Sequence, residues 1–261
     1  MSGPEAAQEQ DEGAMSILGH LDELRSRLFR SAIAVIVMLA AMWSFRDPLL
    51  TFVMKPIQSR LPEGQSLQQI EMMEAFSIYL NTCALAAVFI ATPYLLYQLW
   101  AFIAPGLYRH ERRMIVPFLV FGTLFFVGGG AFGYLVAVPV AADWLISLGS
   151  DTGLFDSSIT LRSAFKFVSR MILAMGLVFE TPLLIFFLSR LGLVTPGFLL
   201  RHFRIAVLVI AIFSAVITPT GDMVTMSVFA VPMIVLYLVG CGAAWLVSRR
   251  DRRDDKARAE V

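Results

Sequence analysis

The sequence is short of charged residues, and this shortage excludes a soluble fold. Only 16% of its 261 residues are charged, whereas 57% are hydrophobic and the mean hydropathy is +0.73. Average soluble domains are about 25% charged, so this composition indicates a membrane protein. The net charge of +1 gives no indication of a nucleic-acid partner.

Cysteines and catalytic motifs are also scarce. Cys83 and Cys241 both lie in apolar runs outside any C-x-x-C motif, so we interpret them as packing thiols and expect no disulfide or metal site. The stretch HERRM begins at His110 like a zinc-protease motif, but Met114 stands where the second histidine ligand is needed. There is no G-x-S-x-G, no Walker loop and no glycine-rich dinucleotide fingerprint after a strand. We therefore expect neither an enzyme nor a cofactor, and an intramembrane hydrolase is only a third-ranked alternative.

Hydrophobic runs of about 20 residues predict an all-α, polytopic membrane protein with six transmembrane helices. The predicted spans are residues 28–45, 78–103, 114–142, 165–190, 203–218 and 223–247. The first fourteen residues include four acids and no base, unlike a signal or transit peptide. We expect residues 1–15 to be a disordered acidic cytoplasmic tail, residues 16–247 to form the membrane domain, and residues 248–261 to be a charged cytoplasmic tail.

Basic residues are unevenly distributed between the two predicted faces of the membrane. An even number of spans places both termini on one side, and that side carries 15 of the 21 bases, which are Arg25, Arg27, Arg30, Arg109, Arg112, Arg113, Arg190, Arg201, Arg204, Arg249, Arg250, Arg252, Arg253, Lys256 and Arg258. The positive-inside rule makes this side cytoplasmic. The outer bases are Arg46, Lys55, Arg60, Arg162, Lys166 and Arg170. Two long outer connections, 46–77 and 143–164, are expected to form short helices and turns that cap the bundle.

The predicted fifth span is short for a membrane crossing. Only fourteen residues separate Arg204 from Pro219, which is about 21 Å of helix against a hydrocarbon core of about 30 Å. We expect Thr195 and Pro196 to begin a cytoplasmic helical turn before this span. The stretch TPTGD, residues 218–222, is typical of a tight turn after it. Our hypothesis is that the bilayer thins beside this hairpin.

Glu180 lies near the middle of the fourth predicted span, where an ionised carboxylate costs about 2.5–3.5 kcal/mol. One interpretation is a protonated acid bonded to carbonyl groups that a kink at Pro182 sets free. Alternatively, Glu180 is a proton-carrying site of a transporter or a polar docking point for another membrane helix. The glycines of the third span are expected to allow close helix packing; they are Gly128, Gly129, Gly130 and Gly133.

Two acids stand among bases near the predicted cytoplasmic boundary. Glu23 precedes the first span, and Glu111 lies in the next cytoplasmic connection. Local charge balance is one explanation, because Glu23 and Arg27 are four residues apart on a helix and such pairs contribute a few tenths of a kcal/mol. The other explanation is a ligand with adjacent guanidinium groups, since arginine and carboxylate match in bidentate geometry.

Several motifs together resemble one known family. They are HLDELRSRL at residues 20–28, YQLWAFIAPGLYRHERR at 97–113, FETP at 179–182, and ITPTGD at 217–222 before a last helix containing VPMIVLYLVG. In this order they are similar to TatC, the receptor subunit of the twin-arginine protein translocase. The resemblance covers about residues 16–247.

The resemblance implies a cup-shaped, six-helix protein of the bacterial inner membrane that recognises twin-arginine signal peptides on folded cargo. Glu23 and Glu111 are then expected to receive the two arginines, within a recognition patch completed by Leu24, Arg25, Phe102, Pro105, Gly106, Leu107 and Tyr108. It also implies single-span partner subunits of the TatA and TatB kind, self-association in the receptor complex, and transport driven by the proton-motive force.

Further roles are implied for other acids. Glu180 is expected to face the concave side and, with Asp222, to form a polar site for the partner subunits. Glu74 and Phe76 match the pattern of the outer loops and are assigned to a periplasmic cap. The chain departs from the family at Leu238, where an acid is common in the last helix, and at Asn81, where a base is common. An ion-coupled small-solute transporter that uses Glu180 is the second-ranked function.

Overall fold

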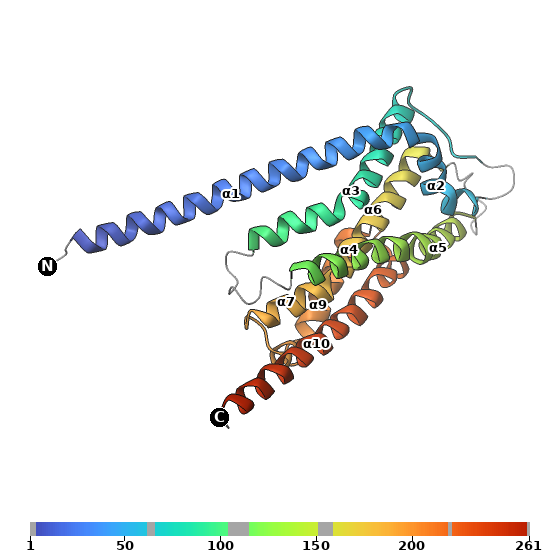
Figure 1. Ribbon diagram of the computed structural model, residues 1–261. Coiled ribbons are helices and arrows are strands. Elements are labelled where there is room, and N and C mark those ends of the chain that lie inside the picture. The colour runs from blue at the N-terminus through green and yellow to red at the C-terminus, as the bar shows by residue number, and fades with distance from the viewer. Residues whose placement is uncertain (1–3, 62–65, 104–114, 151–158, 219–220, 260–261) are drawn as a thin grey trace.

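The computed structural model describes the backbone of residues 4–61, 66–103, 115–150, 159–218 and 221–259. Within these ranges the chain is helical, apart from turns and a single parallel bridge between Gln68 and Thr160. In chain order the elements are α1 (Pro4–Met42), a 3-10 turn (Trp43–Phe45), α2 (Arg46–Gln58), α3 (Glu74–Ile103), α4 (Ile115–Phe132), a π-helical turn (Gly133–Ala137), α5 (Val138–Ser150), α6 (Leu161–Phe179), α7 (Thr181–Arg190), α8 (Pro196–Arg201), α9 (Phe203–Ile217) and α10 (Met223–Ala259) (Figure 1).

Five helical segments are long and apolar enough to cross a bilayer, and they are Gly19–Gln58, Glu74–Ile103, Val116–Leu148, Leu161–Arg190 and Met223–Trp245. The all-helical, multi-span class predicted from the sequence is therefore confirmed. The predicted fifth span corresponds to α9, whose 15 residues make about 22 Å of helix, less than the hydrocarbon core needs. Six membrane crossings therefore stay a prediction.

The helical segments run further than the predicted spans. The first continues past residue 45 through the 3-10 turn into α2, because Pro48 falls in the first turn of α2, where a missing N–H breaks no helical hydrogen bond. The backbone of α1 is helical from Pro4, and that of α10 continues to Ala259. Both tails are rich in alanine, glutamate, glutamine or arginine, which are good helix formers. The disorder of residues 1–15 and the domain boundaries stay predictions.

Glycines of α4 and the π-helical turn bring neighbouring helices close together. A Cβ on Gly129 would stand 2.5 Å from the backbone oxygen of Met175 on α6. A Cβ on Gly130 would meet an aromatic ring of α3, and one on Gly133 would meet the α6 backbone at 3.1 Å. The packing role is confirmed for these three glycines and is wrong for Gly128, which faces open space.

The fourth segment is broken at Glu180, between α6 and α7. The Glu180 N–H donates to the Leu177 carbonyl at 3.1 Å, which tightens the last turn of α6. Pro182 occupies the first turn of α7, where its missing N–H is tolerated. The predicted kink at this proline is confirmed.

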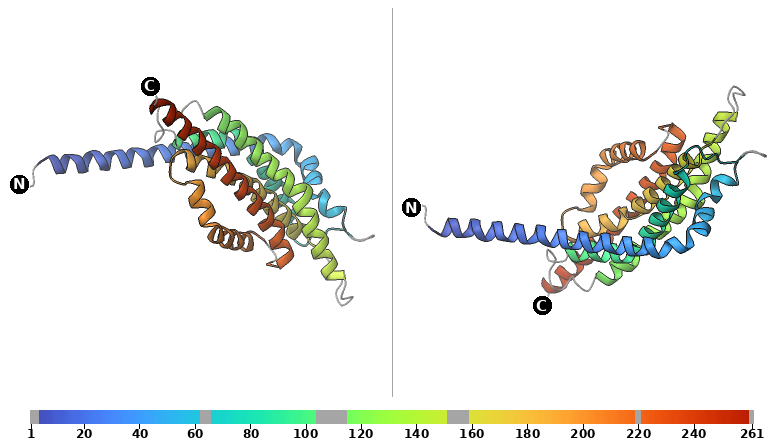
Figure 2. Two further views of the ribbon diagram at one scale, coloured as in Figure 1. Left: turned by 90° about the horizontal axis from the view of Figure 1, so that it is seen from below. Right: turned by 90° about the horizontal axis from the view of Figure 1, so that it is seen from above.

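The predicted start of α8 at Thr195 and Pro196 is also confirmed. Thr195 caps α8 by accepting a hydrogen bond from the Phe198 N–H at 3.2 Å, and Pro196 is the first helical residue. Gly221 in the turn before α10 has φ +61°, a left-handed conformation that glycine adopts without strain. In both views of Figure 2, α8 and α9 arch away from the remainder of the bundle.

The described parts of the two predicted connections, residues 46–77 and 143–164, lie together at the end of the bundle that carries α2 (Figure 1). Their position on the outer side of the membrane stays a prediction. We call this end of the bundle the capped end, formed by α2, the starts of α3 and α6, and the end of α5. Arg60 at the end of α2 pairs with Asp143 of α5 at 2.7 Å. The Tyr134 hydroxyl donates to the Phe52 carbonyl at 2.7 Å. The Pro4 end of α1 and the Ala259 end of α10 lie at the opposite end of the bundle (Figure 1).

Both cysteines are buried and unpaired, which confirms their packing role. Cys83 is fully buried at the contact between α3 and α1, where its thiol lies 3.6 Å from the Met42 carbonyl. Cys241 is 5% exposed and belongs to a small apolar cluster with Ile185 and Leu199.

Candidate functional site

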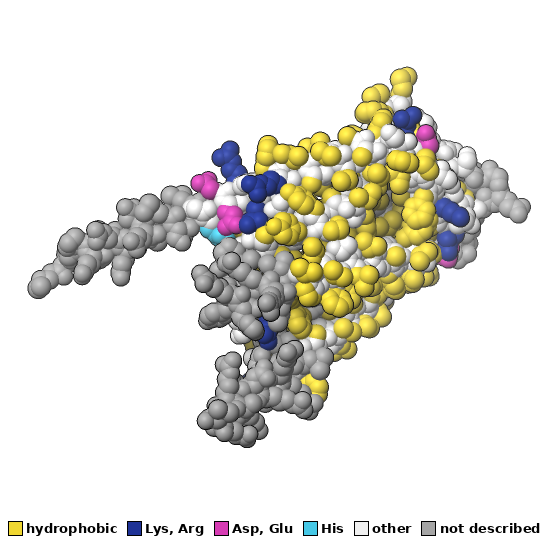
Figure 3. Space-filling model, viewed as in Figure 1, with side chains coloured by type: hydrophobic (Ala, Val, Ile, Leu, Met, Phe, Trp, Pro, Cys, Tyr) yellow, Lys and Arg dark blue, Asp and Glu magenta, His cyan; other side chains and the backbone are white. Residues whose placement is uncertain are grey.

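The end opposite the cap carries a cluster of charged side chains on α1, which we call the charged shoulder. It consists of His20, Glu23 and Arg27 of α1 with Gln98 and Phe102 of α3. Figure 3 shows these charges beside a broad hydrophobic surface, with a second group of charges at the capped end. This distribution fits a bilayer whose hydrocarbon region lies between two polar boundaries.

Glu23 is held in the charged shoulder by a single guanidinium group. Its Oε1 accepts hydrogen bonds from Arg27 Nε at 2.9 Å and from Arg27 Nη2 at 2.6 Å. Arg27 also donates to Gln98 Oε1 at 3.3 Å, and the Gln98 amide donates to the Tyr94 hydroxyl at 2.6 Å. The local i, i+4 pair considered from the sequence is therefore formed, and it is anchored to α3.

The second carboxylate oxygen of Glu23 makes a weaker contact than the first. Oε2 lies 3.9 Å from His20 Nδ1, which is too long for a hydrogen bond. The His20 ring stacks on Phe102, with ring centroids 4.3 Å apart and planes inclined by 15°. The Glu23 side chain is 31% exposed, so it lies partly accessible at the rim of the shoulder.

The remaining predicted recognition residues divide into two groups. Leu24 is 42% exposed on α1, and Arg25 is also exposed. The others, Pro105, Gly106, Leu107, Tyr108 and Glu111, lie outside the described residues. The structure therefore brings Glu23 and Phe102 into one cluster and does not test the pairing of Glu23 with Glu111.

Glu180 is half-buried at the break between α6 and α7. Its Oε1 is buried and has no hydrogen-bond partner among the described residues. Its Oε2 lies 3.4 Å from the position that a Cβ on Gly122 of α4 would occupy. The carboxyl group therefore packs next to Gly122. Because buried polar atoms are normally hydrogen-bonded, the unsatisfied oxygen indicates that this carboxyl group binds a proton or a partner outside the described residues.

Asp222 lies at the start of α10. Its Oδ1 accepts a hydrogen bond from the Thr225 N–H at 2.8 Å, which is the geometry of a helix N-cap. A capping role explains an acid at this position, and the partner role assigned to Asp222 stays a prediction.

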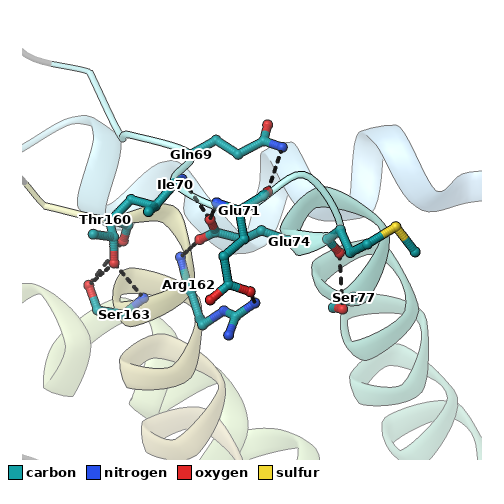
Figure 4. A network of polar contacts seen from close by, with 9 residues as sticks. Gln69, Ile70, Glu71, Glu74, Ser77, Thr160, Arg162 and Ser163 are labelled. Carbon is teal, nitrogen blue, oxygen red and sulfur yellow. Dashed lines mark hydrogen bonds and ion pairs between the residues drawn. The ribbon is translucent and has the colours of Figure 1, made fainter.

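Glu74 has the most complete polar environment in the described part of the chain (Figure 4). It is 1% exposed. Its Oε2 accepts from the N–H groups of Ile70 and Glu71 at 2.9 and 3.2 Å, and its Oε1 accepts from the Arg162 N–H at 2.8 Å. One carboxylate thus ties the loop before α3 to the first turn of α6. An anion at a helix N-terminus is also favoured by the helix dipole.

Two further contacts join the same segments. The Arg162 guanidinium donates to Glu71 Oε2 at 2.5 Å, and the backbones of Gln68 and Thr160 form the parallel bridge. Phe76, assigned to the same cap, is 52% exposed and meets Trp43 edge-on at 5.8 Å.

The sequence did not predict three of the side chains that complete these polar clusters, namely Gln98, Tyr94 and Arg162. Gln98 is only 5% exposed within an apolar helix, and a buried amide needs hydrogen-bond partners. An amide side chain within an apolar predicted span was the available signal. Glu74 and Arg162 are 88 positions apart in the sequence. No motif near either residue indicates that the two are in contact.

Comparison with known proteins agrees with this architecture. Residues 19–232 match the family model described as Sec-independent protein translocase protein (TatC). The chain belongs to the TatC family. A TatC-family protein of Koribacter versatilis is 38% identical over 250 residues, covering 95% of this chain and 91% of the relative. One from Campylobacter jejuni is 39% identical over 219 residues, covering 84% and 89%.

Solved structures of TatC share the fold. One, described as the crystal structure of the twin arginine translocase receptor TatC, superposes with a TM-score of 0.77 at 30% identity. The match covers 88% of this chain and 99% of the crystallised one. The resemblance noted from the motifs is therefore confirmed, and the chain is a multi-span membrane protein of the TatC family of transport proteins.

Proposed function

We propose that this chain is the receptor subunit of a twin-arginine protein translocase in the bacterial inner membrane. In this proposal the charged shoulder faces the cytoplasm and binds the signal peptides of folded cargo. Both termini then lie in the cytoplasm, as the excess of bases at that end favours. The related crystal structure is described as that of a twin arginine translocase receptor, which supports the assignment.

The observation that carries the proposal is the Glu23 carboxylate and its guanidinium partner. Glu23 already accepts two hydrogen bonds from one guanidinium, so its setting accommodates the group that a signal arginine would present. Arg27 is a side-chain partner, and an incoming arginine can share or replace it without unfolding α1. Glu111 is proposed as the second acceptor.

A peptide-binding experiment tests this assignment. The full chain in nanodiscs is titrated with a labelled twin-arginine peptide and with its Lys-Lys counterpart. We expect Glu23→Ala and Glu111→Ala each to raise the Kd for the twin-arginine peptide about tenfold or more, because truncating one member of a close charge pair is costly. Asp22→Ala is the matched control, since it removes a neighbouring exposed acid from the same helix.

The outcomes separate the receptor from the alternative. Equal affinity for the Arg-Arg and Lys-Lys peptides, or no difference between the Glu23→Ala and Asp22→Ala variants, would refute the receptor assignment. An ion-coupled carrier has no reason to distinguish the two peptides.

We also propose that Glu180 and Asp222 contribute to the binding of single-span TatA- and TatB-type subunits, and that transport uses the proton-motive force. The unsatisfied Glu180 oxygen supports this part, because a polar group in a membrane is stabilised by a hydrogen bond from another helix. Glu180→Ala should reduce co-purification of the partner subunits more than it reduces peptide binding. If peptide binding alone is lost, Glu180 belongs to the signal site.

A further inference from the structure

Two cations on α6 stand beside cavities and have no acidic partner within the described part of the chain. Lys166 and Arg170 are both exposed and lie four residues apart, on one face of the helix. Among the described residues, no Asp or Glu side chain lies within ion-pair distance of either one. Like charges at this spacing repel each other, so an anion between them would stabilise the pair.

Their depth makes this arrangement costly in a bilayer. The segment Leu161–Arg190 has 30 residues, about 45 Å of helix, so about 7 Å would project from each side of a hydrocarbon core of about 30 Å. Lys166 then lies at the boundary on the side of the capped end, and Arg170 lies about one turn further in. A cation at this depth needs a counter-ion or must extend back toward the boundary.

A large apolar groove begins at the same two cations. It has a volume of about 1020 Å³ and is enclosed by α6, α7, α9 and α10. Its outer wall is α9, which arches away from the remainder of the bundle in Figure 2. Its walls include Leu177, which is 66% exposed, and Phe213, which is 56% exposed. From Lys166 to Leu177 is about 16 Å along the helix, close to the depth of one leaflet.

A second, smaller cavity lies on the other flank of the two cations. It has a volume of about 380 Å³, and Ile57, Leu145 and Ser163 help to line it. Lys166 and Arg170 border both spaces. The cations therefore form a charged ridge, with a long apolar groove on one side and a cavity between α2, α5 and α6 on the other.

We propose that this ridge and groove bind one anionic, two-chain phospholipid. The lipid phosphate lies between Lys166 and Arg170, and an acyl chain runs along the groove toward Leu177. The smaller cavity holds part of the headgroup or glycerol region. The charge of the ridge selects an anion, and the apolar wall selects a chain, so a lipid satisfies both where a soluble anion satisfies only the first. This site goes beyond signal recognition and does not depend on it.

Lipid titration of the full-length, delipidated protein by native mass spectrometry tests the proposal. Dioleoylphosphatidylglycerol should bind about 30-fold more tightly than dioleoylphosphatidylcholine, given two favourable charge contacts. The double variant Lys166→Gln/Arg170→Gln should reduce this preference to about twofold or less. The matched control is Arg201→Gln/Arg204→Gln, which removes two exposed cations near the opposite end of the groove and should keep the preference.

Photo-crosslinking identifies what fills the groove in cell membranes. Benzoylphenylalanine in place of Phe213 should form adducts enriched in anionic phospholipid, and the enrichment should disappear in the Lys166→Gln/Arg170→Gln background. The same probe at Leu208, which is 60% exposed on α9 and does not line the groove, should show no such dependence.

Several results would overturn the proposal. Equal binding of the two lipids, or an unchanged preference in the Lys166→Gln/Arg170→Gln protein, would show that Lys166 and Arg170 do not bind the lipid phosphate. If glycerophosphoglycerol, which lacks acyl chains, competes for the site as strongly as the lipid does, the two cations bind a soluble anion and the groove does not contribute. A polypeptide adduct at position 213 would make the groove a docking surface for a membrane helix. None of these results bears on the twin-arginine peptide assay, so the two proposals fail independently.

Discussion

Glu74 and Glu23 are carboxylates at opposite ends of the same bundle, and they have opposite kinds of partner. Glu74 is 1% exposed and accepts hydrogen bonds from three backbone N–H groups. Glu23 is 31% exposed and accepts from the side chain of Arg27. Backbone donors cannot leave without unfolding a loop, whereas a guanidinium can move aside. The first arrangement is suited to holding a fold and the second to exchanging partners.

Glu180 is a third carboxylate, and its surroundings differ from those of Glu74 and Glu23. It is half-buried, and one of its oxygens has no hydrogen-bond partner among the described residues. It neither holds two segments together nor sits at an exposed rim. The three acids therefore predict different responses to substitution, which can be compared through unfolding temperatures measured at one scan rate in one detergent.

The largest effect is expected for Glu74→Ala. This change leaves three backbone donors at the capped end without an acceptor, so we expect the unfolding temperature to fall by about 5 °C or more. Protease cleavage between residues 66 and 73 should increase as well. Glu74→Gln, which keeps the shape and one acceptor oxygen, should lose less. An unfolding temperature unchanged by Glu74→Ala would show that this acid does not hold the cap.

An effect of intermediate size and opposite sign is expected for Glu180→Leu. Removing a buried oxygen that lacks a partner should raise the unfolding temperature by about 2–4 °C, since such a group costs about 1–3 kcal/mol. Cargo transport should fall in the same variant if the carboxyl serves a partner subunit. A large drop in unfolding temperature would mean that Glu180 is structural, like Glu74.

A smaller effect is expected for Glu71→Gln. This variant breaks the ion pair with Arg162 but leaves the Glu74 hydrogen bonds in place. Both side chains are more than one-third exposed, so the pair contributes about 0.5–1 kcal/mol and the unfolding temperature should fall by about 2 °C. A loss equal to that of Glu74→Ala would assign the stability of the cap to the ion pair instead.

The smallest change in stability is expected for Arg27→Gln. An i, i+4 pair contributes about 0.3–0.5 kcal/mol, so the unfolding temperature should change by about 1 °C. The twin-arginine peptide should bind a few-fold more tightly, because a competing guanidinium has been removed from Glu23. Weaker binding in this variant would indicate that Arg27 positions Glu23 for the peptide and does not compete with it.

Features that depend on neighbours in the chain were predictable. The Thr195 cap, the break before Pro182 and the short α9 follow from residues a few positions apart, because capping and proline geometry are local. The i, i+4 pair of Glu23 and Arg27 was open to prediction for the same reason. Gly128 shows where prediction from local sequence fails, since only the packing of α4 distinguishes it from Gly129.

The partners of Glu23 and Glu74 on other helices were not predictable. Gln98 reaches Arg27 across 71 positions, and the Arg162 N–H reaches Glu74 across 88. Neither segment contains a motif for the other, because each contact depends on how two helices pack. The groove beside Lys166 and Arg170 has the same origin, since its walls come from α6, α7, α9 and α10.

By itself, the sequence determined that this chain is a helical membrane protein of the TatC family and where most of its helices bend or begin. These properties follow from apolar runs, prolines, caps and motifs, all of which act over short distances along the chain. Only the tertiary structure decided which carboxylate is bonded to the backbone, which to a side chain, and which has an oxygen without a partner among the described residues. Helix packing sets those partners, and packing is determined by shape complementarity over the whole bundle.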